Sequence, residues 1–400
     1  MKMSKLAITI GLVFTSSAGL VQADGFAEAI TGGDTTLDAN LRYESVSQDN
    51  GLKDANALTL RTRLNYTTAD YNGAVGVIEF EDSRVVAGVD DYNNTLGKNT
   101  DHSVIADPET TELDQAYLQY KYAGLTAKGG RQVMTLDNQR FVGDVGWRQD
   151  RQTFDALHLS YLINDALQID YAYIDQRNRI FAEAKDINAK DNLLNASYKT
   201  SVGKLTGYAY LLEEDEGVSN GLDTYGLRFS GSTKLSDTQI LYTAEYATQD
   251  ADVGNSTYST DYMTLEAGAV FAGITAKLGY ELLGSDSGDY GFATPLATLH
   301  KFNGWSDQFL NTPTQGLADL YLSVSSKVAG GSFTLAYHEF SADESNATID
   351  DLGSEINAVY AMPIAKHYKV GVKYAGYFAG DSAAGKVDTD KVWVWASAKF

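Results

Sequence analysis

The arginines of this 400-residue chain could carry chemistry, because all eleven precede residue 229 and none follows it. A guanidinium group stays charged and holds a rigid fork of donors, which suits bidentate pairing with carboxylates. Arginines gathered on one surface would therefore favour anionic solutes such as organic acids or acidic sugars. The eleven are Arg42, Arg61, Arg63, Arg84, Arg131, Arg140, Arg148, Arg151, Arg177, Arg179 and Arg228.

Signatures of catalysis are weak. The five histidines are scattered and none has metal-ligand spacing. Residues 217–221 match the G-x-S-x-G pattern, but they lie in an acidic segment between two predicted strands rather than on a strand-to-helix turn. We expect no enzymatic activity, no catalytic residue, no metal and no cofactor. A barrel hydrolase whose Ser, His and acid meet only in space stays an alternative.

Clusters of acidic residues occur in the predicted loops at Asp90-Asp91, at Asp286 with Asp289, and at residues 213–216. They could hold calcium or bridge to lipopolysaccharide, but no EF-hand spacing is present. Solvated loop charge is the interpretation that we favour. The formal charge of −22 makes a nucleic-acid partner unexpected, since such binding needs basic residues against phosphates.

Composition and the N-terminus indicate an exported β protein. The chain has 26 Tyr, 37 Gly, 4 Pro and no Cys, and aromatic and β-branched residues are spaced along its whole length. Residues 1–23 have the lysines, the short apolar run and the small residues of a signal peptide. We expect cleavage before Asp24, which leaves residues 24–400 as one domain. No later stretch is long and apolar enough for a transmembrane helix.

Alternating apolar and polar residues form segments of the length that a tilted strand needs to cross a bilayer. The clearest are Leu58 to Tyr66 and Val392 to Phe400, each with one apolar face. The connections sort into two classes. Short links are predicted near 68–73, 123–124, 162–166, 201–203, 234–237, 271–273, 328–331 and 362–367. Longer ones are predicted near 47–57, 84–111, 134–152, 176–191, 213–223, 249–259, 284–316, 341–353 and 380–389.

These connections predict an all-β fold, a transmembrane antiparallel β-barrel of about eighteen strands with short periplasmic turns and long extracellular loops. The four prolines all fall in predicted loops or turns. This is expected, because proline has no backbone N–H to donate to a neighbouring strand. A soluble sandwich, propeller or solenoid is the alternative, but its connections would not alternate in length.

Strand parity then assigns side chains to the lumen. Arg42, Arg61, Arg63 and Arg228 face inward, with Glu79, Glu81 and other carboxylates on the same face. Arg131 is ambiguous because Gly129-Gly130 could form a bulge. Arg140, Arg148, Arg151, Arg177 and Arg179 lie in or beside long loops that could fold inward. Two interpretations stay open: the charges pair with one another, or they set up a transverse field that selects solutes.

The stretch Leu136 to Gln149 resembles the hallmark loop of the alginate-export porin family. Leu60-Arg61-Thr62-Arg63, Glu79-Phe80-Glu81-Asp82 and residues 41–44, 90–93 and 106–109 support the resemblance, which covers about residues 35–230. It implies an eighteen-stranded barrel with an electropositive constriction that passes polyuronate, with Arg61, Arg63, Arg140 and Arg148 in matching segments. The chain has no arginine after Arg228, which differs from the dense row of positive charges expected along a path for a polyanion. Phe400 resembles the terminal signal read by the outer-membrane assembly machinery.

We therefore predict a passive porin of the bacterial outer membrane for small hydrophilic solutes, with anionic or saccharide solutes favoured and lipid and lipopolysaccharide around it. Polyuronate export is one alternative, and a surface-binding barrel or adhesin without channel activity is another. The candidate pore-lining residues are Arg42, Arg61, Arg63, Glu79, Glu81, Arg131, Arg140, Arg148, Arg177, Arg179 and Arg228.

Overall fold

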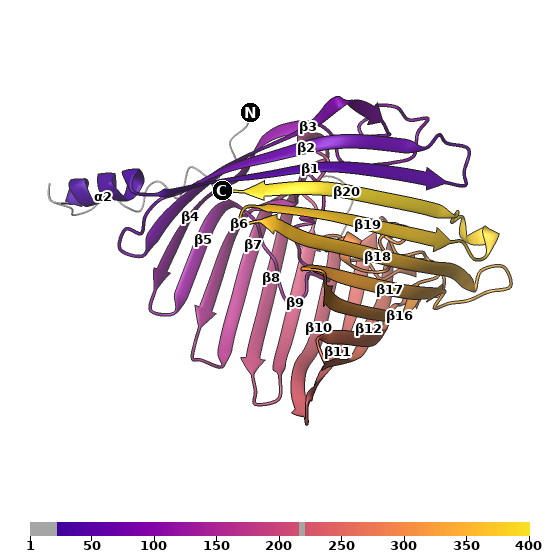
Figure 1. The fold of residues 1–400 in the computed structure, drawn as a ribbon. Helices are drawn as coiled ribbons and strands as arrows, with labels where there is room; N and C mark the ends of the chain where they lie inside the picture. Colours follow the sequence, from indigo (N-terminus) through magenta and orange to yellow (C-terminus); the bar gives the residue numbers. More distant parts are fainter. Residues whose placement is uncertain (1–21, 216–220) are drawn as a thin grey trace.

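Eighteen antiparallel strands form one closed sheet in the computed structural model, which describes residues 22–215 and 221–400 (Figure 1). Each strand pairs with its neighbours in the sequence, and β1 also pairs with β20, so the sheet closes into a barrel. The predicted all-β barrel and its strand number are confirmed. The expected signal peptide lies almost entirely outside the described residues.

The strands of the barrel are β1 (Asp34–Gln48), β2 (Ala55–Thr67), β3 (Ala74–Asp91), β4 (Thr110–Tyr122), β5 (Leu125–Gln132), β6 (Thr153–Leu162), β7 (Leu167–Asn178), β8 (Ile187–Lys199), β9 (Lys204–Glu213), β10 (Gly221–Leu235), β11 (Thr238–Val253), β12 (Ser256–Phe271), β13 (Ile274–Leu283), β16 (Leu317–Val328), β17 (Gly331–Ser341), β18 (Asp351–Ala365), β19 (Tyr368–Phe378) and β20 (Thr389–Lys399).

The remaining elements are helix α2 (Gln22–Thr31), the short 3₁₀ helices η2 (Glu183–Lys185), η3 (Leu299–Lys301) and η4 (Ser382–Ala384), and the two-residue strands β14 (Ser285–Asp286) and β15 (Tyr290–Gly291). No helix in the described part of the chain has the length and apolar character needed to cross a membrane.

The wall of the barrel follows the two-residue period of its strands. In β2, Thr59, Arg61 and Arg63 are buried toward the lumen, whereas Leu64 is exposed on the outside. Aromatic side chains are exposed on the outer surface near both ends of the strands, as in the interfacial girdles of outer-membrane barrels. Near the short turns these are Tyr122, Tyr161, Tyr198, Phe271, Tyr368 and Phe400, and nearer the long loops Tyr225, Tyr246, Tyr337 and Tyr374.

All eight predicted short links occur between consecutive strands, and the longer links alternate with them. One longer link is wrong: β11 and β12 pair as far as Val253 and Ser256, so only two residues connect them. Pairs such as Asp250 with Ser259 carry polar side chains on a ladder that extends beyond the bilayer. The same polar composition in the sequence is typical of a loop, which explains the error.

Pro363 also differs from the prediction, because it lies inside β18 rather than in a turn. The register between β18 and β19 shifts between Pro363 and Ala365. A bulge of this kind tolerates a residue that has no backbone N–H to donate.

Two long connections, residues 133–152 and 284–316, fold into the lumen of the barrel instead of projecting from it. Met134 and Val142 from the first segment, and Phe292 and Phe309 from the second, join one buried cluster with wall residues such as Phe340. Burial of these apolar side chains stabilises the inward position of both segments. We call residues 133–152 and 284–316 the first and second inward loops.

Candidate functional site: the constriction of the barrel

The two inward loops hold each other by backbone hydrogen bonds inside the lumen. The Gly143 N–H donates to the Leu296 carbonyl at 2.8 Å, and the Thr298 N–H donates to the Gln139 carbonyl at 3.1 Å. The side chain of Gln152 donates to the carbonyls of both Gly143 and Leu296. A Cβ on Gly143 would overlap the Thr298 hydroxyl, so glycine is needed at this close approach. The loops therefore form one layer across the lumen.

Arg140 joins this layer to the second half of the wall. Its Nε lies 2.9 Å from Glu281 Oε1 on β13, and its Nη2 donates to Asn303 Oδ1 at 3.0 Å. The guanidinium also lies over the Phe302 ring, 4.8 Å from its centroid. Arg140 is only 1% exposed, so its charge is shared with Glu281 rather than offered to the lumen.

Arg148 joins the layer to the first strand. Its Nη1 lies 3.3 Å from Glu44 Oε2 on β1, and its Nη2 lies 2.8 Å from Asp307 Oδ2 on the second inward loop. Asp307 also contacts His300 and Lys391. Burial alone would raise the pKa of Asp307, but His300, Lys391 and Arg148 hold it well below its usual range. The carboxylate stays ionised and fixes both loops to the wall.

The predicted lumenal arginines of the wall are each paired with a carboxylate. Arg42 pairs with Asp107 and donates to the Trp147 carbonyl. The other wall pairs are Arg61 with Asp38, Arg63 with Glu81 and Asp114, and Arg228 with Glu245. Glu79 accepts from Arg151, which also contacts Asp114 at 2.7 Å. Of the two interpretations that the sequence left open, this geometry matches mutual pairing.

Arg177 and Arg179 lie at the end of β7 where a long connection begins. They line a cavity of about 390 Å³ that the second inward loop also lines. Arg177 pairs bidentately with Asp191, at 2.8 and 2.7 Å. Arg179 stacks over Phe181, 5.1 Å from its centroid. Arg179 has no ion pair with a carboxylate within the described ranges 22–215 and 221–400. Its guanidinium is thus the candidate best placed to meet an entering anion.

Arg131 does not line the lumen. It pairs in register with Ala116, which pairs with the exposed Ile78, so all three share the outer face of the sheet. Pairing runs through Gly129-Gly130 without a register shift, and the bulge considered for this position does not form. The side chain instead pairs with Asp155 on β6 at 2.8 Å.

An aromatic cage around Lys373 was missed by sequence reasoning. Its Nζ lies 4.1 Å from the Trp147 ring centroid and 4.0 Å from that of Trp305, with Trp393 at 5.3 Å. It also donates to His300 Nε2 at 2.6 Å. The lumenal parity of Trp393, opposite Glu44 on β1, is the signal that could have indicated a lumenal aromatic residue here.

Burial lowers the pKa of His300 to about 3. The charge of Lys373 also lowers this pKa, whereas Asp307 raises it. His300 is therefore neutral, accepting from Lys373 and donating to Asp307.

A second cavity of about 400 Å³ lies between the inward loops and the β10–β17 wall. It contains cations paired with acids, such as Lys277 with Glu266, beside the aromatic rings of Phe302 and Trp305. Lys301 also lines it and donates to the Asn138 carbonyl. Aromatic faces and charged donors together suit organic acids or sugars rather than apolar ligands.

Among the described residues, the acidic clusters at Asp90-Asp91 and at Asp286 with Asp289 do not gather three carboxylates that could hold one ion. Asp90 pairs with Lys98, and Asp286 accepts from the Ser259 backbone. Residues 216–220, which include most of the G-x-S-x-G match and the end of the 213–216 cluster, lie outside the described residues. Among the residues that are described, three carboxylates do gather elsewhere, at Glu81, Glu112 and Asp150.

Comparisons with known proteins agree with this architecture. A family model described as alginate export matches residues 34–286. The structure is similar to that of Acinetobacter baumannii OccAB4, with a TM-score of 0.72, 13% identity, and coverage of 92% of this chain and 98% of that one. Pseudomonas aeruginosa OpdK with vanillate gives the same values. Pseudomonas aeruginosa OccK9 matches at a TM-score of 0.72 and 12% identity, over 93% and 99% of the chains. No curated protein sequence matches.

Proposed function

The chain belongs to the alginate export family of outer-membrane barrels, and from this premise and the geometry of the lumen we propose a passive channel for small anionic or saccharide solutes. A barrel of this strand number leaves an aqueous lumen by its geometry. Passage through it needs neither a cofactor nor a catalytic residue. The bacterial outer membrane is its location.

The layer of inward loops is the observation that carries this proposal. The second inward loop lines both cavities, the one beside Arg179 and the one beside Lys301. A solute would move from one cavity to the other past this loop. Both cavities are far smaller than the lumen of an open eighteen-stranded barrel, so the loops rather than the wall set the size limit.

The chemistry of the cavities favours small organic acids and sugars. Arg179 and Lys301 offer donors, and Phe302 and Trp305 offer flat faces on which a ring can lie. The OpdK structure holds vanillate, an aromatic carboxylate, in a barrel of similar fold. A solute of that class fits both the size and the mixed charge of the cavities.

Polyuronate transport is the second candidate, and the family match favours it. The pairing of Arg61 with Asp38 and of Arg63 with Glu81 counts against a dense polyanion path, since a uronate would have to displace a carboxylate from each arginine. If uronates pass, replacing Arg61 and Arg63 by Ala should weaken block by uronate oligomers. Unchanged block would remove this candidate.

Single-channel recording in planar bilayers tests the main proposal. We expect discrete conductance steps and transient block by aromatic carboxylates from either side. Reversal potentials in a salt gradient should report a modest anion preference, because the arginines of the wall are paired, whereas Arg179 and Lys301 have no ion pair with a carboxylate among residues 22–215 and 221–400. Absence of any conductance by the folded barrel would contradict the channel and favour a surface-binding barrel.

A further inference from the structure

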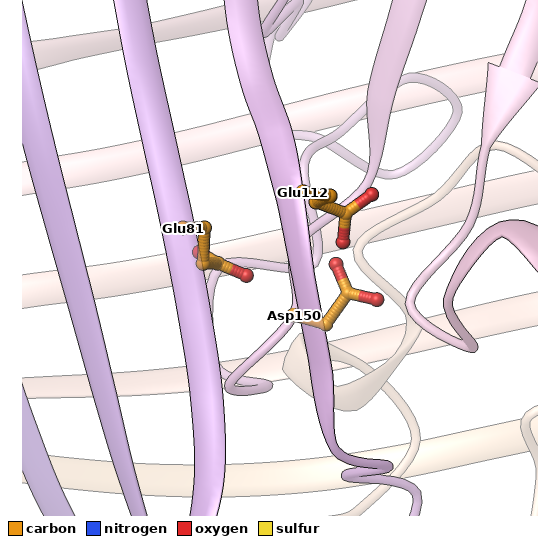
Figure 2. Close-up of side chains that lie close together, drawn as sticks. All are labelled: Glu81, Glu112 and Asp150. Atoms are coloured by element: carbon orange, nitrogen blue, oxygen red, sulfur yellow. The ribbon is translucent and has the colours of Figure 1, made fainter. Parts of the chain in front are cut away.

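Three carboxylates meet where the first inward loop touches the wall (Figure 2). Glu81 comes from β3, Glu112 from the neighbouring β4, and Asp150 from the loop. One oxygen of each lies within 4.8 Å of the others. Oxygens that share one calcium ion, each at about 2.3–2.6 Å, can be at most about 5 Å apart. The three oxygens are thus already at the separation that one such ion requires.

Two oxygens of this group lack partners. Glu81 is 1% exposed, and its Oε1 is buried without a hydrogen-bond partner, although its other oxygen pairs with Arg63. Glu112 Oε1 is likewise buried and unpartnered. A buried carboxylate oxygen without a donor costs free energy of about 1–3 kcal/mol or more. A cation at each oxygen, or a proton shared with a neighbouring carboxyl group, would offset this cost.

The surrounding arginines cannot supply that charge, because they are shared. Arg63 contacts Asp114 as well as Glu81, and Arg151 contacts Glu79 and Asp114. Arg61 and Arg131 also lie near this group, but they pair with Asp38 and Asp155. Five carboxylates therefore share Arg63 and Arg151: Glu79, Glu81, Glu112, Asp114 and Asp150. The ion pairs of both arginines are with Glu79, Glu81 and Asp114, and not with Asp150 or Glu112. A divalent ion would remove most of the excess negative charge.

We propose that Glu81, Glu112 and Asp150 bind a divalent cation of the calcium class, which fastens the first inward loop to β3 and β4. Calcium fits better than magnesium, because it accepts irregular sets of carboxylate oxygens, whereas magnesium demands octahedral geometry and keeps its water. Burial, together with Glu112 and Glu81, raises the pKa of Asp150 to about 10. The three carboxylates thus repel one another when no counter-charge lies between them.

The experiment uses the full chain, folded in detergent and treated with EDTA. Terbium luminescence and its displacement by calcium measure the site, and thermal unfolding with calcium or EDTA measures the coupling to stability. The test variant is Glu112→Gln with Asp150→Asn. The matched control is Glu344→Gln, which removes one charge from an exposed loop. Heat-modifiable migration on gels shows whether each variant is folded.

We expect one terbium ion per wild-type chain, displacement by calcium, and a calcium-dependent rise in the unfolding temperature. The control should keep all three properties. The folded double variant should lose at least tenfold in terbium affinity and the calcium-dependent rise. Wild-type protein that binds no ion would overturn the proposal and assign the charge balance to protons. Full binding by the double variant would overturn it too, since the ion would then lie in the surface loops. Neither result depends on whether the barrel conducts.

Discussion

Arg148 is held between two carboxylates from separate parts of the barrel, Glu44 on β1 and Asp307 on the second inward loop. Arg148→Ala would leave both carboxylates buried without this partner, at a cost on the order of 3 kcal/mol to loop docking. It would also remove one positive charge from the constriction, while Glu44 keeps Arg42 and Asp307 keeps Lys391 nearby. We expect the reversal potential to shift toward cation preference and the open channel to become noisier.

The control for this change is Arg84→Ala. Arg84 pairs with Asp82 on the outer face of β3, and its side chain is 46% exposed. We expect its replacement to leave selectivity unchanged, since a surface pair of this kind contributes little. A similar shift in both variants would show that Arg148 acts through the net charge of the protein, not through the constriction.

His300 makes the docking of the second inward loop sensitive to acid. Its pKa is lowered to about 3 in the docked loop, compared with about 6.5 when exposed. A lowered pKa means that docking is fully stable above about pH 6.5 and loses stability as the pH falls toward 3. Protonation would place a charge beside Lys373 and Arg148. Acidification from about pH 7.5 to about pH 5 should therefore increase current fluctuations.

His300→Gln removes this titration and should make the fluctuations independent of pH over that range. His367→Gln serves as the control, because His367 bonds the Lys399 carbonyl at the periplasmic end of the barrel. Wild-type currents that do not change with pH would rule out His300 as the cause of any acid response.

At this scale the sequence indicated which arginines face the lumen but not what they contact. Strand parity placed Arg61 and Arg63 correctly, since parity is a local property of each strand. The partners of Arg140 and Arg148 come from segments more than 100 residues away, and no local pattern contains that information. The facing of Arg131 stayed ambiguous because two adjacent glycines permit a bulge without requiring one, and the unshifted register decides it.

The two inward loops are the elements on which the constriction depends. Gly143 approaches Thr298 so closely that any side chain must push the loops apart. Gly143→Val should cost about 1–3 kcal/mol in overpacking and separate the loops, which widens the passage. We expect a larger single-channel conductance and entry of larger neutral solutes in a liposome swelling assay.

Gly51→Val is the matched control, because nothing lies within 4 Å of the position of a Cβ on Gly51. Its conductance should equal that of the wild type. An unchanged conductance of folded Gly143→Val protein would show that the contact between the loops does not set the width of the passage.

The ends of the strands were predictable where an apolar strand is followed directly by turn residues. The turn at residues 123–124 is a glycine-containing link between apolar strands, and it occurs as predicted. The hairpin at Gly254 was missed because β11 and β12 continue into water, where both faces can be polar. The inward folding of residues 284–316 was also beyond prediction, since it depends on burial against the finished barrel.

On the scale of the whole molecule, wall and constriction are built by different interactions. The wall rests on continuous backbone pairing from β1 to β20, which lipid enforces because no strand edge can stay unpaired there. The constriction rests on ion pairs and apolar contacts between loops and wall. Loop variants should therefore alter conductance while the barrel still folds, which is why heat-modifiability and conductance are measured together.

Replacing the side chain of Phe400 distinguishes two roles of this residue, one in closing the barrel and one in its assembly in the cell. The Phe400 backbone exchanges two hydrogen bonds with Leu37, at 2.9 and 3.1 Å, and its side chain is 52% exposed on the outer surface. Phe400→Ala keeps these backbone bonds, so the purified chain should still fold in detergent. If the assembly machinery reads the side chain, the amount of folded protein in the outer membrane should fall severalfold. Phe378→Ala removes an equally exposed phenylalanine from β19 and should assemble normally. Equal assembly of both variants would restrict Phe400 to a role in the outer surface of the barrel.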